Sequence, residues 1–108
     1  MPRHQFATVH ELARISMFAG VPGETLGKLA ERMERMSLDP GETIEETTAP
    51  GSFYVVLAGM LSGGGVLRPG DSFGGGHPFG EVRAAMPSTV ATCDRETYDL
   101  YIAPLISA

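Results

Sequence analysis

The sequence has little of what marks an exported or membrane-bound protein. Its 108 residues include one cysteine, Cys93, so no disulfide can form within the chain. A single thiol fits a reducing compartment, and we expect a cytoplasmic protein. No apolar run approaches the length of a membrane span, and the first residues, MPRHQFATVHELAR, lack the long apolar core of a signal peptide. We therefore expect no membrane segment.

Positive charge is also scarce. Eight lysines and arginines stand against 13 aspartates and glutamates, which gives a formal net charge of -5. A protein that binds nucleic acid or an acidic membrane through its charge carries a basic surface. The composition therefore predicts neither partner, and any anion site would be a local exception.

The sequence shows no recognisable catalytic or metal-binding motif. No serine, histidine and aspartate, and no cysteine and histidine, occur in a known catalytic context. His4, His10 and Glu11 do not make a metal-ligand set. Cys93 lies among strand residues and is interpreted as a buried apolar side chain. We expect a non-enzymatic protein without a metal or cofactor.

The first third of the chain has the pattern of helices. Thr8 and Glu11 have the spacing of a capping box at a helix start. A second helix is expected to begin near Pro22, because proline suits the first turn of a helix. Its apolar residues recur at i, i+3, i+4 and i+7, namely Leu26, Leu29, Ala30 and Met33.

From Met36 onward the chain consists of short segments between turns rich in glycine and proline. The densest is FYVVL at residues 53–57, which is rich in strand formers. We expect further strands at residues 43–44, 66–67, 89–92 and 98–102, and a short helix at residues 78–85. Helices followed by many short strands predict one α+β domain, with helices over residues 1–35 packed on a small antiparallel, jelly-roll-like β-roll over residues 36–108.

The order of these segments resembles the cyclic-nucleotide-binding domain family over nearly the whole chain. GETI at residues 41–44 and FYVVLAG at residues 53–59 are similar to two strand motifs of that family. PGDSFG at residues 69–74 is similar to the approach to its phosphate-binding cassette, and STVAT at residues 88–92 resembles the strand that leaves it. The resemblance implies a β-roll with a short cassette helix, and a regulatory module that senses cAMP, cGMP or another small anion.

The family's ligand contacts are altered in this sequence. In the family, backbone N–H groups at a helix start hold the cyclic phosphate, an arginine pairs with it, and a glutamate accepts a hydrogen bond from the ribose. Aligned on PGDSFG, the glutamate position holds Gly75; aligned backwards from STVAT, the arginine position holds Met86. A second register, FGEVRAA at residues 79–85, supplies Glu81 and Arg83, but only two residues apart where the family has most of a helix.

Two further departures concern the walls of the roll. Residues 60–65 make a stub where the family has a longer hairpin, and the residues after 103 leave no room for the family's C-terminal lid helix. Both would reduce the enclosure of a purine. Since no helix-turn-helix is present either, direct gene regulation by this chain alone is not expected.

The candidate ligand-binding residues are the first Phe-Gly pair, the glycines after it, and charged and hydroxyl residues further along the chain: Phe73, Gly74, Gly75, Gly76, Glu81, Arg83, Ser88 and Thr89. If an anion binds, we expect the glycine amides and Arg83 to hold it, with Arg68 as the competitor. Each charged candidate also has an interpretation without a ligand. Arg83 could be solvated on the surface, Glu81 could only favour a helix start electrostatically, and His77 could be exposed in its loop. We expect cAMP to bind more weakly than about 10 µM, because losing a charge-assisted bond costs roughly 1.5–3 kcal/mol.

Two functions therefore stay open. One is a weak sensor whose effector moves the N-terminal helices, at residues 9–17 and 22–35, against a protein partner. The other is a degenerate, ligand-free domain that serves as a protein-interaction or structural subunit. The sequence does not decide the oligomeric state, and a homodimer remains open.

Overall fold

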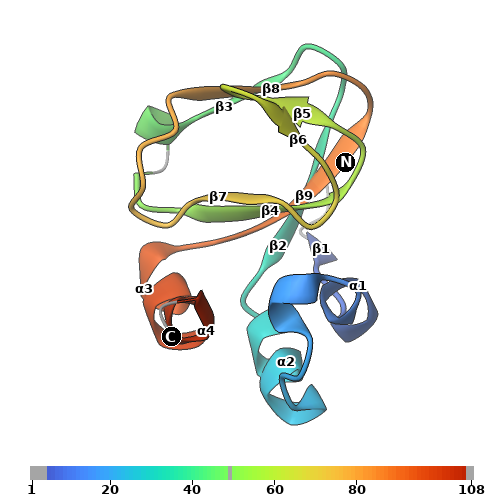
Figure 1. Ribbon diagram of the computed structural model, residues 1–108, viewed down its shortest axis with the longest axis vertical. Helices are drawn as coiled ribbons and strands as arrows, with labels where there is room; N and C mark the ends of the chain where they lie inside the picture. The colour runs from blue at the N-terminus through green and yellow to red at the C-terminus, as the bar shows by residue number, and fades with distance from the viewer. Residues whose placement is uncertain (1–4, 49, 107–108) are drawn as a thin grey trace.

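The computed structural model of the chain describes residues 5–48 and 50–106. Two antiparallel sheets form a β-roll, and short helices pack against the outside of one of them (Figure 1). The larger sheet has the strand order β1-β2-β9-β4-β7, and the smaller has the order β3-β8-β5-β6. This architecture confirms the α+β class with N-terminal helices on a small antiparallel roll.

The strands are short and account for most of residues 34–93. Their bounds are β1 Gln5–Phe6, β2 Glu34–Leu38, β3 Thr43–Glu45, β4 Phe53–Ala58, β5 Leu61–Ser62, β6 Val66–Leu67, β7 Ser72–Gly74, β8 Glu81–Ala84 and β9 Ser88–Cys93. The helices lie at the two ends of the chain and at one turn. Their bounds are α1 Val9–Ala13, η1 Ser16–Phe18, α2 Gly23–Ala30, η2 Glu46–Thr48, α3 Arg95–Thr97, η3 Tyr98–Ile102 and α4 Ala103–Ile106.

The N-terminal helices begin where the sequence predicts. Thr8 caps α1, and the side chains of Thr8 and Glu11 each accept a hydrogen bond from the other's backbone N–H, at 3.2 and 3.0 Å. Pro22 is the N-cap of α2, and the predicted apolar stripe of that helix is buried. Met33 is buried too, although α2 has ended at Ala30. The β-roll begins at Glu34, two residues before the predicted boundary.

The strand β4 lies between two hydrophobic cores. Phe53 and Val55 pack with the helices in the first core, on the outer face of the larger sheet. Tyr54 and Val56 belong to the second core, inside the roll. A strand buried on both faces reads as a continuous apolar run, which is why FYVVL was the clearest strand signal in the sequence.

The helix predicted at residues 78–85 is wrong. Residues 78–80 have no regular structure, and β8 follows, paired with β3 and β5. Val82 and Ala84 are buried while Glu81 and Arg83 are exposed, which is the alternation of a half-buried strand. Pairing on both sides outweighs the helical propensity of this short segment.

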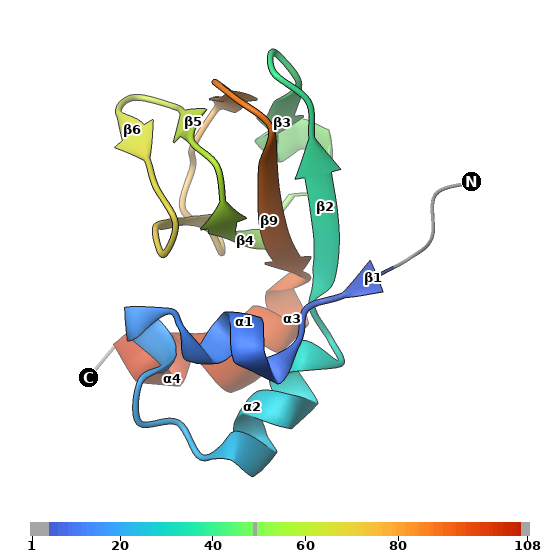
Figure 2. The same ribbon diagram turned by 90° about the vertical axis from the view of Figure 1, so that its right-hand side faces the viewer.

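The strand predicted at residues 98–102 is also wrong. These residues are helical, inside a C-terminal segment of continuous helix from Arg95 to Ile106. Tyr98, Tyr101 and Ile102 pack on the first core at i, i+3 and i+4, whereas Leu100 is 64% exposed. Asp94 starts the segment, because its side chain accepts a hydrogen bond from Thr97 N at 2.8 Å. Figure 2 shows this segment beside α1 and α2, below the roll.

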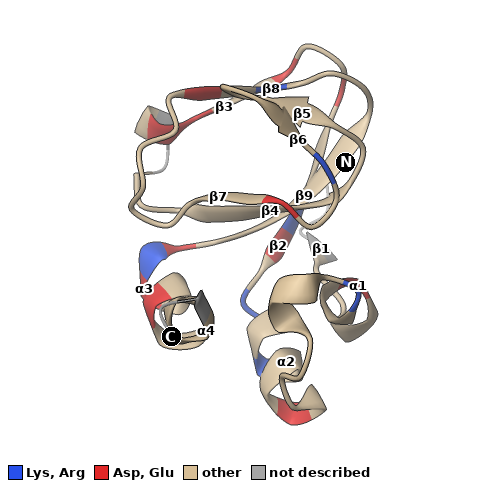
Figure 3. Ribbon diagram, viewed as in Figure 1, with Lys and Arg blue, Asp and Glu red and all other residues tan. Residues whose placement is uncertain are grey.

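Within the described residues, no helix is long and apolar enough to cross a membrane. The same residues hold no group of three or more histidine, cysteine, aspartate or glutamate side chains placed for a metal ion. His4 lies outside the described part of the chain. Lysines and arginines are spread over several elements (Figure 3).

Candidate functional site

The glycine loop after β7 packs closely against the C-terminal helices. Gly74, Gly75 and Gly76 have φ values of 88, 69 and 92°, a region that glycine adopts with little strain. A Cβ on Gly75 would lie 2.7 Å from the ring of Tyr98, and one on Gly76 would collide with the guanidinium of Arg95. The loop needs glycine, therefore, because protein atoms come within contact distance of its backbone.

Two backbone N–H groups of this loop already donate hydrogen bonds within the chain. Gly75 N donates to Ser52 O at 2.9 Å, and His77 N donates to Gly74 O at 3.4 Å. The loop does not lead into a helix, since residues 78–80 are irregular and β8 follows. A phosphate site of the type that the resemblance implies uses unpaired N–H groups at a helix start, and this loop does not supply that arrangement.

Aromatic rings pack against one another in the roll beside the loop. Phe73 stacks on Tyr54 with ring centroids 4.9 Å apart, and Phe79 meets the edge of Phe73 at 5.0 Å. Around them lie the buried aliphatic side chains of the second core: Leu38, Ile44, Val56, Leu61, Val82, Ala84 and Val90. Both phenylalanines of the repeated Phe-Gly motif are thus half-buried and pack against the core of the roll.

The predicted charged partners lie on the outer face of the smaller sheet. Glu81 and Arg83 are exposed on β8, two residues apart on the same face, and form an ion pair at 3.6 Å. The side chains that β8 directs into the roll are Val82 and Ala84. A charged side chain that points into solvent does not compensate a phosphate held inside the roll.

The predicted hydroxyl residues lie at the far end of β9 from the glycine loop. Strand register aligns Gly74 with Phe53 and Phe53 with Cys93, the last residue of β9. Ser88 is the first residue of β9, so about 15 Å of strand separates it from Cys93, which is level with the glycine loop. Buried Ser88 donates from Oγ to Met86 O at 2.7 Å and accepts at Oγ from Met60 N at 3.1 Å.

Thr89 faces the helical layer instead of the interior of the roll. It is half-buried and lines a crevice there with Arg14 and Arg35. Its β9 neighbour Val90 is the one that belongs to the core inside the roll. Of the predicted ligand-binding residues, the structure therefore brings together only Phe73 and the three glycines.

A small cavity lies at the mouth of the roll. Its volume is about 250 Å³, and its walls are Phe53, Ser72, Phe73, Gly74, His77, Pro78, Phe79 and Tyr98. Pockets for drug-sized ligands are commonly about 300–1,000 Å³. The cavity is smaller than that, and no lysine or arginine is among its walls.

Two buried titratable groups carry no sign of reactivity. Burial raises the pKa of the Cys93 thiol to about 12, and the negative charge of Asp94 adds to the effect. Burial also raises the pKa of Tyr54, against the hydrogen bonds of Thr92 and Ser52. Both side chains are therefore neutral near pH 7, and Cys93 lacks the low pKa of a nucleophilic thiol.

No protein-family model matches the chain, and no curated protein sequence matches it. Solved structures do. A regulatory subunit of a cAMP-independent protein kinase A from Trypanosoma brucei superposes with a TM-score of 0.78 at 20% identity over 92% of this chain. The regulatory domain of Toxoplasma gondii PKA with cAMP gives 0.72 at 18% identity over 90%. A cAMP-binding acyltransferase from Mycobacterium smegmatis gives 0.66 at 21% identity over 92%.

These matches cover 42%, 44% and 37% of the three solved chains, so this chain spans less than half of each. The likeness is one of fold. The chain has the cyclic-nucleotide-binding-domain fold. Its two sheets and N-terminal helices agree with what the sequence resemblance implies.

Sequence reasoning missed the neighbours of the glycine loop in this cyclic-nucleotide-binding-domain fold. Arg95 and Tyr98 contact the loop, and Arg95 is the cation beside it, with Asp99 Oδ1 as its ion-pair partner at 3.0 Å from Nε. One signal was available: Asp94 precedes apolar residues at i, i+3 and i+4, which is typical of a capped helix. The ring of Tyr98 also lies 4.9 Å from that of Phe53, which anchors the segment to β4.

Proposed function

We propose that this chain is a non-enzymatic module of the cyclic-nucleotide-binding-domain fold whose roll takes no cyclic nucleotide and whose N-terminal helical layer contacts a protein partner. One observation carries the first half of the proposal: the rings of Tyr54, Phe73 and Phe79 pack against one another in the roll beside the glycine loop. A nucleotide would have to displace packed rings, and filled protein interiors resist such a change.

Charge supports the same conclusion. A cyclic phosphate carries a negative charge that has to be paired or hydrogen-bonded once it leaves water. Inside the roll, β8 directs only Val82 and Ala84 toward that position, and Arg83 is on the outer face with Glu81 as its partner. The neighbour from T. brucei, a regulatory subunit of a cAMP-independent protein kinase A, is a precedent for this fold in a cAMP-independent system.

The surface that we propose for the partner lies on β1, α1 and α2. Phe6 is 51% exposed and Val9 is 37% exposed. They border a groove of about 570 Å³. The charged residues that line this groove are Glu24, Lys28 and Glu31. Because acidic side chains outnumber basic ones at the rim, the expected partner presents an apolar anchor with a basic flank.

Calorimetry and thermal unfolding with cAMP and cGMP test the first half of the proposal. We expect no saturable heat below about 100 µM ligand and no rise in melting temperature, because a ligand that binds the folded state raises it by mass action. Submicromolar binding of either nucleotide would contradict the proposal.

Site-specific photo-crosslinking tests the second half. A photoreactive phenylalanine analogue replaces Phe6 in one variant and Val66, 56% exposed on β6, in the control. We expect a protein crosslinked from position 6 and not from position 66, which then binds the purified chain more weakly after Phe6→Ser. Equal capture from both positions would contradict the proposed surface.

A weak sensor is the second candidate, and the small cavity of about 250 Å³ at the mouth of the roll favours it. An inorganic anion would fit there beside His77 and Ser72. In that case phosphate, and not a whole cyclic nucleotide, should raise the melting temperature, and His77→Ala should abolish the effect. If phosphate does not raise the melting temperature, the ligand-free module that contacts a protein partner is the better account.

A further inference from the structure

A second hollow lies outside the roll, between the helical layer and the larger sheet. Its volume is about 600 Å³, within the range of small-molecule pockets. Its lining includes the charged side chains of Glu11, Arg14 and Arg35 and the uncharged side chains of Ser16, Leu57 and Thr89. The helical wall is the end of α1 and the start of η1; the other wall is β2, β9 and β4 with the turn before β7. We call this hollow the crevice.

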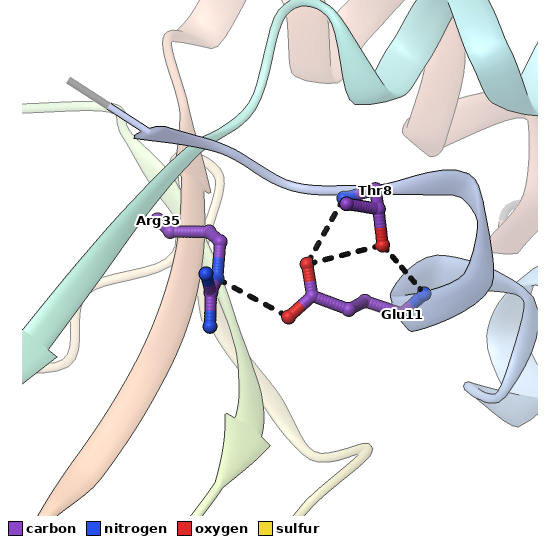
Figure 4. A network of polar contacts seen from close by, with 3 residues as sticks. All are labelled: Thr8, Glu11 and Arg35. Atoms are coloured by element: carbon purple, nitrogen blue, oxygen red, sulfur yellow. Dashed lines mark hydrogen bonds and ion pairs between the residues drawn. The ribbon is translucent and has the colours of Figure 1, made fainter.

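The charged wall of the crevice is net positive. Glu11 is occupied within the chain: its Oε1 accepts from Thr8 N at 3.0 Å, and its Oε2 forms an ion pair with Arg35 Nε at 3.1 Å (Figure 4). The ion pair joins the side chain of Arg35, on β2, to α1 at the crevice wall. Arg14, at the C-cap of α1, adds a second guanidinium, and no second carboxylate lines the crevice within the described residues.

The remaining walls suit a ligand that is partly apolar. Ile15, Leu57 and Pro69 supply apolar surface, and the hydroxyls of Ser16 and Thr89 supply neutral hydrogen-bonding groups. Pairing fixes the place of Thr89, since it lies between Ser37 of β2 and Ala58 of β4. Convergent polar groups within a mostly preformed hollow are the usual features of a small-molecule site.

We propose that the crevice binds a small organic anion, with its carboxylate or phosphate at Arg14 and Arg35 and its apolar body against Leu57 and Pro69. Guanidinium groups suit both acids, because their planar N–H donors match two oxygens at once. A ligand in this place joins the end of α1 to the sheet, and thus connects the proposed partner surface to the roll.

Two-dimensional NMR of the full chain tests the proposal with four probes: phenyl phosphate, benzoate, inorganic phosphate and benzyl alcohol. We expect the first two to shift the amides of Ser16, Gly59, Gly70 and Thr89 saturably at millimolar concentration or below. Inorganic phosphate lacks the apolar body and benzyl alcohol lacks the charge, so both should bind at least several-fold more weakly. The stronger of the first two identifies the acid. No saturable shift of these amides with either acid overturns the proposal.

A matched pair of variants separates a site from diffuse charge attraction. Arg14→Gln should weaken binding about tenfold, the usual effect of losing one charge-assisted hydrogen bond. Arg83→Gln makes the same change of charge on the outer face of β8 and should have no effect. Arg14 is exposed, so the variant should keep the wild-type melting temperature. Equal weakening by both variants would overturn the proposal.

The same spectra distinguish this proposal from the proposed function. Cyclic AMP is itself an organic anion, and in the crevice it would shift Ser16 and Thr89 in a manner that Arg14→Gln removes. In the roll it would shift the amide signals of residues 73–76 instead. That result would contradict the proposed function without bearing on the proposal for the crevice.

Discussion

The two faces of the larger sheet differ in how they are filled. On the inner face, Tyr54 and Val56 of β4 pack with aliphatic side chains of the smaller sheet and with the rings of Phe73 and Phe79. On the outer face, helices cover most of the sheet and leave a charged hollow at one end. The comparison teaches that burial of apolar side chains on both faces is enough to set the strand positions of this sheet, while the charged hollow lies on its outer face.

The largest expected effect comes from opening the inner face. Leu61 is fully buried in the roll, and Leu61→Ala should lower the free energy of unfolding by about 2–5 kcal/mol, because the cavity collapses only in part. Val66→Ala, on the exposed neighbouring strand β6, should stay within about 0.5 kcal/mol. Urea unfolding measures both. A loss for Leu61→Ala no larger than the control would mean that the roll is not packed.

The glycine loop gives the next largest effect. Gly75→Ala places a methyl group 2.7 Å from the Tyr98 ring at a φ of 69°, whereas Gly64→Ala has a similar φ of 77° and open space. Backbone strain should lower the free energy of unfolding by about 1–2 kcal/mol in both variants. The overlap of the new methyl group with the Tyr98 ring should lower it by roughly 1–3 kcal/mol more in Gly75→Ala alone. Equal destabilisation of the two variants in urea unfolding would show that the loop does not pack on the C-terminal helices.

A smaller effect is expected at the start of the C-terminal helical segment. Asp94→Ala removes the cap on Thr97 N and should cost about 0.5–2 kcal/mol. Hydrogen bonds from Thr97 lower the pKa of Asp94, so its stabilisation is present above the ordinary pKa of about 4 and is lost as the pH falls through the lowered value. The difference between wild type and variant should therefore shrink in acid. A difference that is constant from pH 7 to pH 2 would contradict the cap.

The smallest expected effect concerns the reactivity of the Cys93 thiol in the folded chain. With its pKa raised to about 12, the thiol is neutral in the folded chain at pH 8 and should react with a thiol reagent only when the chain opens. Its contribution to stability is complete below the ordinary thiol pKa near 9 and is lost as the pH rises toward about 12. Native labelling at pH 8 as fast as labelling in urea would show that β9 is exposed at Cys93.

The strands at residues 43–44, 53–57, 66–67 and 89–92 and the cap of α1 were predictable because their signals are local. Thr8 and Glu11 satisfy a capping box wherever it occurs, and a run such as FYVVL is apolar because both its faces are buried. The segments at residues 78–85 and 98–102 were not predictable in the same way. Their local propensity is weak, and pairing with β3 and β5 or packing on Phe53 decides their structure.

The candidate site was predictable only in part, because its contacts join distant segments. Register through β4 places Gly74 level with Cys93, which brings Arg95 and Tyr98 to the glycine loop. No spacing within the motif encodes that contact. Thr89 was selected for the roll and lines the crevice, since its outward face depends on the register of β9 with both neighbouring strands.

The central claim is that the roll is filled and takes no cyclic nucleotide, and NMR with cAMP tests it most directly. Amides of residues 73–76 and methyl groups of Leu61 and Val82 report on the inner face of the roll. We predict that they keep their positions up to millimolar cAMP, whatever happens in the crevice. Saturable shifts of these signals with a dissociation constant below about 10 µM would contradict the account.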